Sequence, residues 1–401
     1  MSKIISADLN HKPDCHPKTE KSIQYREVSK GVKRKAAEDP SDPPDMVVTK
    51  SLRKQDPDDK DCLGSKDVSL LKQIVYYERN KSVPHKLPKN LDQLFDQMDD
   101  VKDRESFRTH GEQFLFPFPA FHMLFITTVT NLMFLCDSAN EHYLADGTFS
   151  YCPHLFDQLY TIMIYRAGHY IPLVHVGLPG KSEVIYTQMW TLLKELCMTL
   201  CDKVLDINHL LVDYEKAAIN SAYLNFPSII ITGCRFHLSQ AWFRWIQRYK
   251  GFDYLSHYLD NTSEIGKWLR IIFGLSFLPP HMIEEAFLLL QELKPSSECD
   301  VFSDYIFDNY IGHLGLADFP PDLWAREVKD SRDVRTTNGP ESFHMNYNAY
   351  FKAKHPSIYK VVFALLLMQE KRYLAFNDIK SGISKPQSNP QIIKDEKVRE
   401  C

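Results

Sequence analysis

The chain has 401 residues, of which 44% are hydrophobic and 12% aromatic, enough apolar material for one large or two moderate globular domains. Its formal net charge of -4 excludes a uniformly basic protein that coats DNA, so contact with nucleic acid has to come from local basic patches. The nine cysteines are dispersed without Cys-x-x-Cys spacing, which favours a reducing compartment over a disulfide scaffold. With no signal-peptide pattern and no apolar run near ~20 residues, we expect a soluble intracellular protein.

Residues 1–65 are rich in Lys, Asp, Pro and Ser and lack hydrophobic periodicity, so we expect a flexible arm. Within it, residues 30–35 form a basic cluster that is either a nuclear-import signal or a solvated run of charge. His11, Cys15 and His16 lie close together, but a fourth ligand is missing, which makes a zinc site in this chain unlikely by ligand count.

Residues 66–135 are predicted to be a helical lead-in. The segment 67–100 indicates two short helices around a linker that contains proline. The apolar run 114–118 is followed by the segment 123–137, which fits either a strand or a helix by periodicity.

From residue 136 to residue 380 the pattern indicates an α/β domain. Apolar runs at 143–151, 159–165 and 170–176 predict three antiparallel strands in a meander. A helix then begins at Ser182, followed by a strand at 208–214, a helix, a strand at 228–233 and a helical region over 238–293, with a further helix near Pro340. We therefore expect a mixed five-stranded sheet flanked by helices, and a disordered tail over 381–401.

Asp146 and Gly147 admit two interpretations. Asp-Gly between apolar flanks is the commonest signal for a tight hairpin turn. Alternatively, the strand continues and Asp146 is a carboxylate fixed on a sheet, with Gly147 giving the backbone room beside a site. Residues 153–157 offer a better turn before the next strand, which favours the second interpretation.

Three acids stand out by their positions. Asp146 lies in the first strand, Asp213 ends the buried strand at 208–214, and Glu341 lies just inside a helix for which Asn338 is a plausible cap. Singly, each acid has an ordinary explanation as a turn residue, a cap or a partner of the helix dipole. Together, acids that converge at one sheet edge repel one another unless a cation neutralises them, and hard divalent ions such as Mg²⁺ take such oxygen ligands.

The segments that carry these acids, "ADGTF", "LLVDYEKAAINSAYLNFP", "GCRFHLSQAWFRWIQ" and "TNGPESFHMNYN", together resemble the Mutator-like (MULE) transposases of the DDE superfamily. The resemblance covers about residues 67–377. It implies an RNase H-like fold with a helical insertion at about 251–335 before the last catalytic helix. It also implies that Asp146, Asp213 and Glu341 bind two Mg²⁺ or Mn²⁺ ions, about 3.5–4 Å apart in such sites, for attack on a DNA phosphodiester.

The roles of other motif residues stay open. Cys234 and His237 match a Cys-x-x-His motif of the family and either share a ligand or serve packing. His344, three residues after Glu341, is either a neighbour that orients the site or a surface residue. The segment 236–251 is one expected DNA contact, through Arg244, Arg248 and Lys250 beside Trp242 and Trp245. The alternative for this segment is an amphipathic helix with its aromatic residues in the core. Residues 351–360 are a second expected DNA contact.

The resemblance departs from the family ahead of the catalytic domain. Residues 11–17 look like the last piece of a zinc finger whose earlier cysteines are missing. The leading hypothesis is a transposon-derived transposase core that cuts and joins double-stranded DNA in the nucleus, with a homo-oligomer as a possible assembly. The alternatives are a domesticated or relic protein that binds DNA or partners without chemistry, and a stand-alone RNase H-like nuclease.

Overall fold

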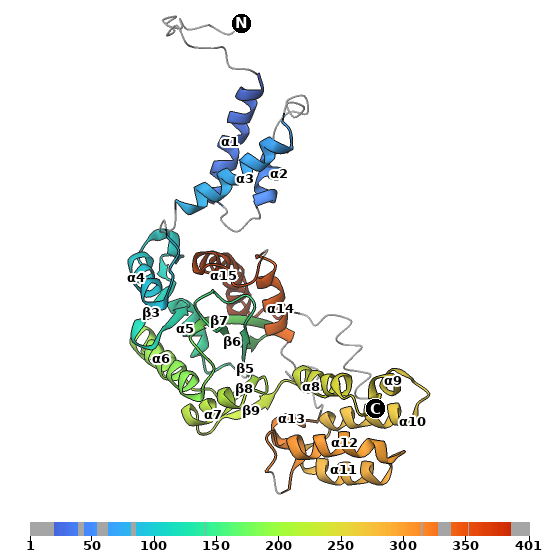
Figure 1. Cartoon of the computed structure of the whole chain (residues 1–401). Coiled ribbons are helices and arrows are strands. Elements are labelled where there is room, and N and C mark those ends of the chain that lie inside the picture. The colour runs from blue at the N-terminus through green and yellow to red at the C-terminus, as the bar shows by residue number, and fades with distance from the viewer. Residues whose placement is uncertain are drawn as a thin grey trace, which may run out of the picture. The chain divides into compact units, whose positions relative to one another are not determined.

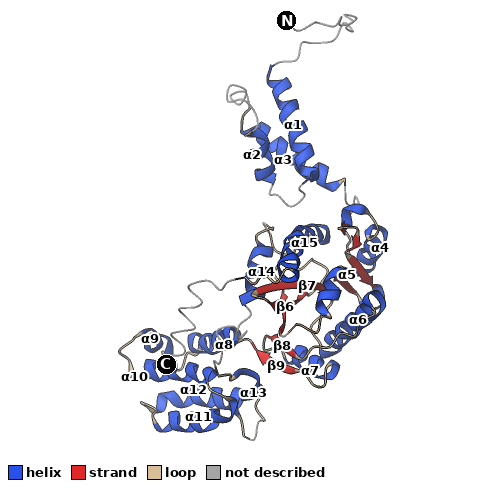
Figure 2. Cartoon of the chain, turned by 180° about the vertical axis from the view of Figure 1, so that it is seen from behind, coloured by secondary structure: helices blue, strands red, loops and turns tan. Residues whose placement is uncertain are grey.

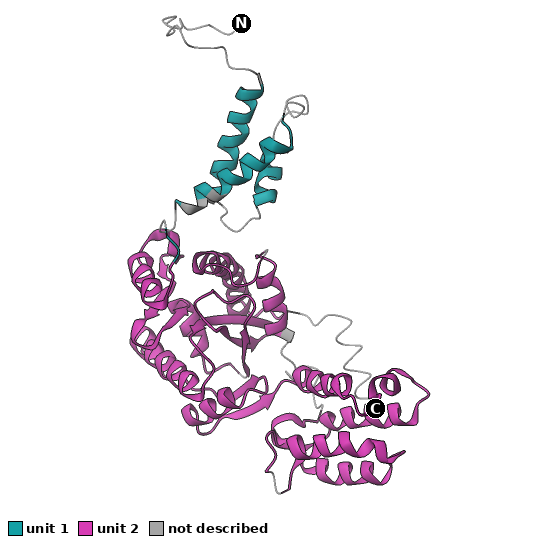
Figure 3. Cartoon of the chain, viewed as in Figure 1, with its two compact units in different colours: residues 1–87 teal, residues 88–401 magenta. Residues whose placement is uncertain are grey.

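The computed structural model of the chain describes residues 20–38, 44–53, 63–81, 86–140, 142–313, 316–327, 338–351 and 353–385 (Figure 1). The chain divides into two compact units, residues 1–87 and residues 88–401 (Figure 3). The proposed remnant of a zinc finger at residues 11–17 and most of the expected tail lie outside the described residues.

The described residues of the first unit form three helices, α1 (Glu20–Glu38), α2 (Pro44–Leu52) and α3 (Ser65–Asn80). This differs from the expectation of a flexible arm over 1–65. Apolar residues in α1 recur every fourth position, a sparse stripe that the polar composition of the segment conceals. The unit has its own small core, formed by Val28, Val32, Ala36, Val47, Val48, Leu71 and Val75.

The second unit is built around a mixed seven-stranded sheet with the strand order β3-β4-β7-β6-β5-β8-β9. The pairs β5–β8 and β8–β9 are parallel and the other pairs are antiparallel. The strands are β3 (Leu115–Phe118), β4 (Met123–Ile126), β5 (His142–Thr148), β6 (Gln158–Arg166), β7 (His169–Leu178), β8 (His209–Val212) and β9 (Ile230–Gly233).

The expected mixed sheet, with a meander followed by strands near 208–214 and 228–233, is therefore confirmed, but the expected count of five strands is wrong. The two additional strands, β3 and β4, come from the lead-in that we expected to be helical. Each has only four residues, and an apolar run of that length has no period long enough to separate strand from helix. A separate two-stranded sheet is formed by β1 (Arg108–Thr109) and β2 (Glu112–Gln113).

Helices lie on both faces of the main sheet (Figure 2). Residues 251–335, expected as a helical insertion, contain α9 to α13 and no strand among their described residues. The helices of this unit are α4 (Leu91–Val101), α5 (Val129–Leu135), α6 (Glu183–Cys201), α7 (Lys216–Asn225), α8 (Arg235–Arg248), α9 (Tyr254–Leu259), α10 (Glu264–Gly274), α11 (Ile283–Glu292), α12 (Asp300–Ile306), α13 (Pro321–Trp324), α14 (Asn338–Asn348) and α15 (Ile358–Lys380). None of the described helices is long and apolar enough to cross a membrane.

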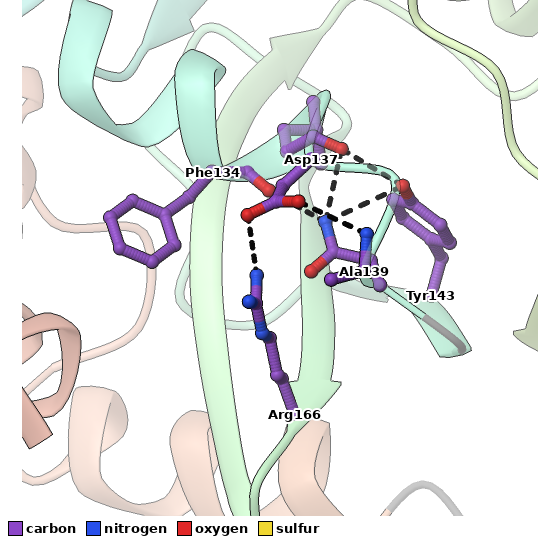
Figure 4. Close-up of polar contacts among 7 residues, drawn as sticks. Phe134, Asp137, Ala139, Tyr143 and Arg166 are labelled. Carbon is purple, nitrogen blue, oxygen red and sulfur yellow. Dashed lines mark hydrogen bonds and ion pairs between the residues drawn. The ribbon is translucent and has the colours of Figure 1, made fainter. Parts of the chain in front are cut away.

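The chain between α5 and β5 is fixed by polar contacts (Figure 4). Arg166 at the end of β6 donates to the carboxylate of Asp137 at 2.6 Å, and the backbone N–H of Ala139 donates to the same carboxylate at 3.0 Å. Burial disfavours the charged carboxylate, but these two contacts outweigh it and lower the pKa of Asp137. The Tyr143 hydroxyl donates to the carbonyl of Leu135 at 2.9 Å. These contacts tie Asp137 to the end of β6 and the start of β5 to the end of α5.

A buried polar network joins the sheet to α15. The Gln369 amide oxygen accepts from Arg372 at 2.6 Å and from Asn131 at 3.0 Å, and the Gln369 amide nitrogen donates to Asn131 at 2.8 Å. All three side chains are buried, so each depends on the others for hydrogen bonds that water would otherwise supply.

We expect Gln369→Leu to destabilise the protein by about 2–4 kcal/mol, because it leaves the Arg372 guanidinium and the Asn131 amide without their acceptor in a buried place. Gln369→Glu, which keeps an acceptor and places a negative charge beside Arg372, is the matched control and should cost less. Urea unfolding followed by circular dichroism measures both variants. Equal loss in the two would show that the acceptor oxygen of Gln369 does not carry this stability, because Gln369→Glu keeps both that oxygen and the shape of the side chain.

Candidate active site

A pocket of about 520 Å³ opens at the edge of the sheet where β5 and β8 end. Its lining comes from β5 and the residues after it, from the residue after β8, from the first turn of α8 and from α14. The lining residues are Asp146, Gly147, Phe149, Asp213, His237, Glu341, His344, Met345 and Asn348. The three acids singled out from the sequence therefore line one pocket, although they are far apart along the chain.

Asp146 lies inside β5 and not in a turn, because β5 pairs with β6 without interruption from His142 to Thr148. The residue is 6% exposed, and its carboxylate accepts a hydrogen bond from the backbone N–H of Gly147 at 2.8 Å. Alternate residues of a strand point to opposite faces of a sheet. Tyr143 and Ala145 join the core that includes α6, whereas the Asp146 carboxylate lies 3.3 Å from His344 of α14 on the other face.

Asp213 follows directly after β8, as expected. The pKa of its carboxyl is raised to about 6. Burial is the main cause, and the negative charges of Asp146 and Glu215 are the next largest causes. Two acids of the pocket therefore repel each other, and the charged form of Asp213 is disfavoured in the protein without a cation.

Glu341 lies in the first turn of α14, which packs over β5 and β7. Two contacts set the position of this helix. The Phe343 ring stacks on the buried His175 of β7 with 5.1 Å between ring centroids. Gly339 lies so close to Tyr170 that a Cβ atom there would be 2.2 Å from the ring. The expected cap, Asn338, is the first residue of α14, and its side chain lies outside the described part of the structure.

His237 and Cys234 are brought to the same end of the sheet. Cys234 is buried at the N-cap position of α8, and His237 in the first turn reaches the pocket. The pKa of His237 is raised to about 9. The contact with Cys234 is the main cause, and the negative charges of Asp146 and Asp213 contribute to the same rise. The imidazolium at neutral pH offsets part of the negative charge of the pocket, which the Cys-x-x-His spacing alone did not indicate.

His344 belongs to the pocket and not to the open surface, since its side chain is 12% exposed and its Nδ1 atom faces Asp146.

A row of polar side chains, which we did not predict, crosses the sheet beside His344. Thr161 pairs with Asp146 in the strand register, and its hydroxyl lies 3.0 Å from Nδ1 of His175. Arg372 donates to the other ring nitrogen of His175 at 2.6 Å. Because a guanidinium only donates, His175 is neutral with its proton on Nδ1, and burial lowers its pKa.

Arg244, Arg248 and Lys250 are exposed but do not line the pocket. Arg248 is eleven residues beyond His237, about 16 Å along the helix axis. Trp242 in the same helix is fully buried and packs edge-on against Trp324, with 5.7 Å between ring centroids. The alternative interpretation of this segment, an amphipathic helix with aromatic residues in the core, is confirmed for Trp242.

The missing side chain of Gly147 does not leave space on the face of the sheet where the acids lie. A Cβ atom at this position would lie 2.3 Å from the side-chain oxygen of Gln158, so the space is taken by that side chain. Gln158 in turn donates to the Tyr186 hydroxyl at 2.6 Å, and Tyr186 donates to Glu215 at 2.9 Å.

Among the described residues, no group of three or more His, Cys, Asp or Glu side chains is arranged so that it could hold a metal ion as it stands. The three acids line one pocket without meeting at a single point. A comparison with models of known protein families found no match to this chain, and a comparison with curated proteins found none either.

Proposed function

We propose that the chain is a DDE-type transposase core of RNase H-like architecture that cuts and joins DNA with divalent metal ions. The observation that carries the proposal is that Asp146, Asp213 and Glu341, from three distant parts of the chain, line one pocket. The neighbouring strands β7-β6-β5-β8-β9 of the seven-stranded sheet, with α6 between β7 and β8 and α7 between β8 and β9, support this proposed architecture. DNA as the partner and the nucleus as the location belong to the same proposal.

The donor set fits Mg²⁺ or Mn²⁺, since carboxylate oxygens are their preferred ligands. Burial first, and the charges of Asp146 and Glu215 second, raise the pKa of Asp213, and a cation would offset this cost of its charged form. Asp146, Asp213 and Glu341 would hold these ions. When bound, such ions activate the attacking oxygen and stabilise the leaving oxygen of a phosphodiester.

The residues of the chain supply position and charge. The central strand and the Gly147 N–H hold the Asp146 carboxylate in a fixed orientation, and His344 faces its second oxygen. The His237 imidazolium places positive charge beside the acids, where a phosphate group would be attracted. Packing of α14 over β5 and β7 delivers Glu341 to the pocket.

The proposal is tested with plasmid DNA and Mg²⁺ or Mn²⁺, scoring nicking and the joining of labelled DNA ends. Wild type should be active, and Asp146→Asn and Glu341→Gln should be inactive. Asp137→Asn is the matched control, because it makes the same change of charge before β5 begins and outside the pocket. If wild type and Asp146→Asn cut equally, the assignment of the acids is wrong.

A second candidate is a domesticated or relic protein that binds DNA without cutting it. The observation that favours it is that the described residues contain no group of ligands already converged for a metal. In the same assay this protein would bind DNA and leave it intact at every metal concentration.

A further inference from the structure

An aromatic ring and a cation lie together at the pocket. Phe149, the first residue after β5, lines the pocket and is 40% exposed. The Lys181 ammonium lies 3.4 Å from the centroid of the Phe149 ring, and Lys181 is itself exposed just before Ser182, the N-cap residue of α6. The pocket that contains the acids is therefore bordered by an apolar ring with a positive charge on its face.

The segment that carries Phe149 is held in place by the end of α14 and the loop after it. The Tyr347 hydroxyl donates to the backbone carbonyl of Tyr151 at 2.9 Å, and the backbone N–H of His355 donates to the carbonyl of Ser150 at 2.9 Å. The rings of Tyr151 and Phe351 stack with 6.2 Å between centroids. The backbone next to Phe149 is therefore held in place, so less backbone freedom is lost when a ligand stacks on its ring. Two residues of the segment 351–360, our second expected DNA contact, thus contact the residues that follow Phe149.

These features match the chemistry of one nucleotide of a strand. Every base has a π-face that stacks on aromatic side chains, and every nucleotide carries a phosphate that attracts ammonium groups. The Lys181 ammonium occupies the place on the ring that a base would take, and a lysine side chain has a long flexible stem that lets its charge move to a phosphate.

We propose that Phe149 and Lys181 form a nucleotide-binding subsite, in which Phe149 stacks on an unpaired base and Lys181 contacts the adjoining phosphate of the DNA strand that enters the pocket. This inference rests on the proposed function, because it takes the ligand of the pocket to be DNA. It goes further in naming an unpaired nucleotide, such as one at a frayed end or a nick, as the part of the DNA that is recognised.

The test measures the binding of the full chain to a fluorescein-labelled 12-nucleotide DNA strand and to the matching duplex, by fluorescence anisotropy in EDTA. Phe149→Ala should weaken binding of the single strand by about 5- to 100-fold, and Phe149→Trp should retain it. Lys181→Gln should reduce the slope of log affinity against log salt concentration by about 0.7. Phe121→Ala is the matched control, since Phe121 is 38% exposed but outside the pocket, and it should bind like wild type.

Equal binding of the single strand by Phe149→Ala and wild type would overturn the subsite, as would failure of wild type to bind the strand. A loss that is equal for the single strand and the duplex would overturn the preference for an unpaired base. The same strand made of RNA shows whether the subsite needs DNA; binding as tight as that of DNA would overturn the assignment to DNA. Because no metal is present, the result is independent of cutting: a protein that binds through Phe149 but never cuts would disprove the transposase proposal and leave the subsite standing.

Discussion

Replacing Asp213 by asparagine is expected to abolish metal-dependent cutting of DNA and at the same time to stabilise the metal-free protein at pH 7.5. The loss of activity should be about 10²–10³-fold or more, because the proposed metal ligand loses its charge while the shape is kept. The gain in stability should be about 1–3 kcal/mol, since a pKa raised from 3.8 to about 6 corresponds to about 3 kcal/mol and the partial exposure of the residue reduces it.

The pH dependence of the stability follows from the direction of this shift. Between pH 3.8 and about 6 the folded protein binds more protons at Asp213 than the unfolded chain, so this group lowers stability as the pH rises through that window. Above pH 6 the full penalty is present, and below pH 3.8 it is absent. The difference in stability between Asp213→Asn and wild type should therefore grow from pH 4 to pH 6.5 and then stay constant, as measured by urea unfolding in EDTA.

Asp137→Asn is the control with the opposite sign. The pKa of Asp137 is lowered in the folded protein, so removing its charge should destabilise the protein above the unfolded pKa and have less effect as the pH falls. If Asp213→Asn also destabilised the protein at pH 7.5, the account of Asp213 as a repelled, desolvated carboxylate would be wrong.

Gly339→Ala is expected to destabilise the protein by about 1–3 kcal/mol and to reduce DNA cutting strongly, because the added methyl group overlaps the ring of Tyr170 and moves α14 away from β7. In an open helix position the same change would stabilise the protein by up to about 1 kcal/mol. The sign of the effect therefore reports the close approach of α14 to the sheet. Thermal unfolding and the plasmid assay measure both consequences.

Gly274, the last residue of α10, provides the matched control, because a Cβ atom there would meet nothing within 4 Å. Gly274→Ala should leave both stability and activity at wild-type levels or slightly above. Adding Tyr170→Ala to Gly339→Ala removes the ring that the methyl group meets, so the two changes together should cost less than their sum. Additive losses would mean that Gly339 is required for another reason.

Much of the site could be predicted from the sequence because its acids occur at recognisable places on elements with a strong period. The runs that became β5, β6 and β7 are long and apolar, and Asp213 directly follows a buried strand. Residues whose placement depends on strand register were not predictable in this way. Thr161 and His175 lie in otherwise apolar strands, and only the pairing of β5, β6 and β7 shows that they share a row with Asp146.

The remaining differences between the predicted and the observed fold arise where the hydrophobic pattern of the sequence is short or sparse. The strands β3 and β4 have four residues each, and α1 buries only one residue in four along Val28, Val32 and Ala36, too few to raise the hydrophobicity of a polar segment. The sequence alone does not decide the place of Trp242, because an aromatic residue on a basic helix fits both a core and a nucleic-acid surface. Packing against the helical insertion, which no local pattern encodes, decides it.

The long stretch of chain between β8 and α14 also affects when, during synthesis of the protein, the three acids become available. Ribosomes add about 5–20 residues per second, so Glu341 is made several seconds or more after Asp213. The sheet strands that carry Asp146 and Asp213 precede the whole insertion, whereas the helix that carries Glu341 follows it. Under the proposed chemistry, a nascent or prematurely ended chain therefore has two acids of the three and no means of cutting the nucleic acid around it. Under that proposal, the chain can cut nucleic acid only after the insertion has been synthesised and α14 has packed on the sheet.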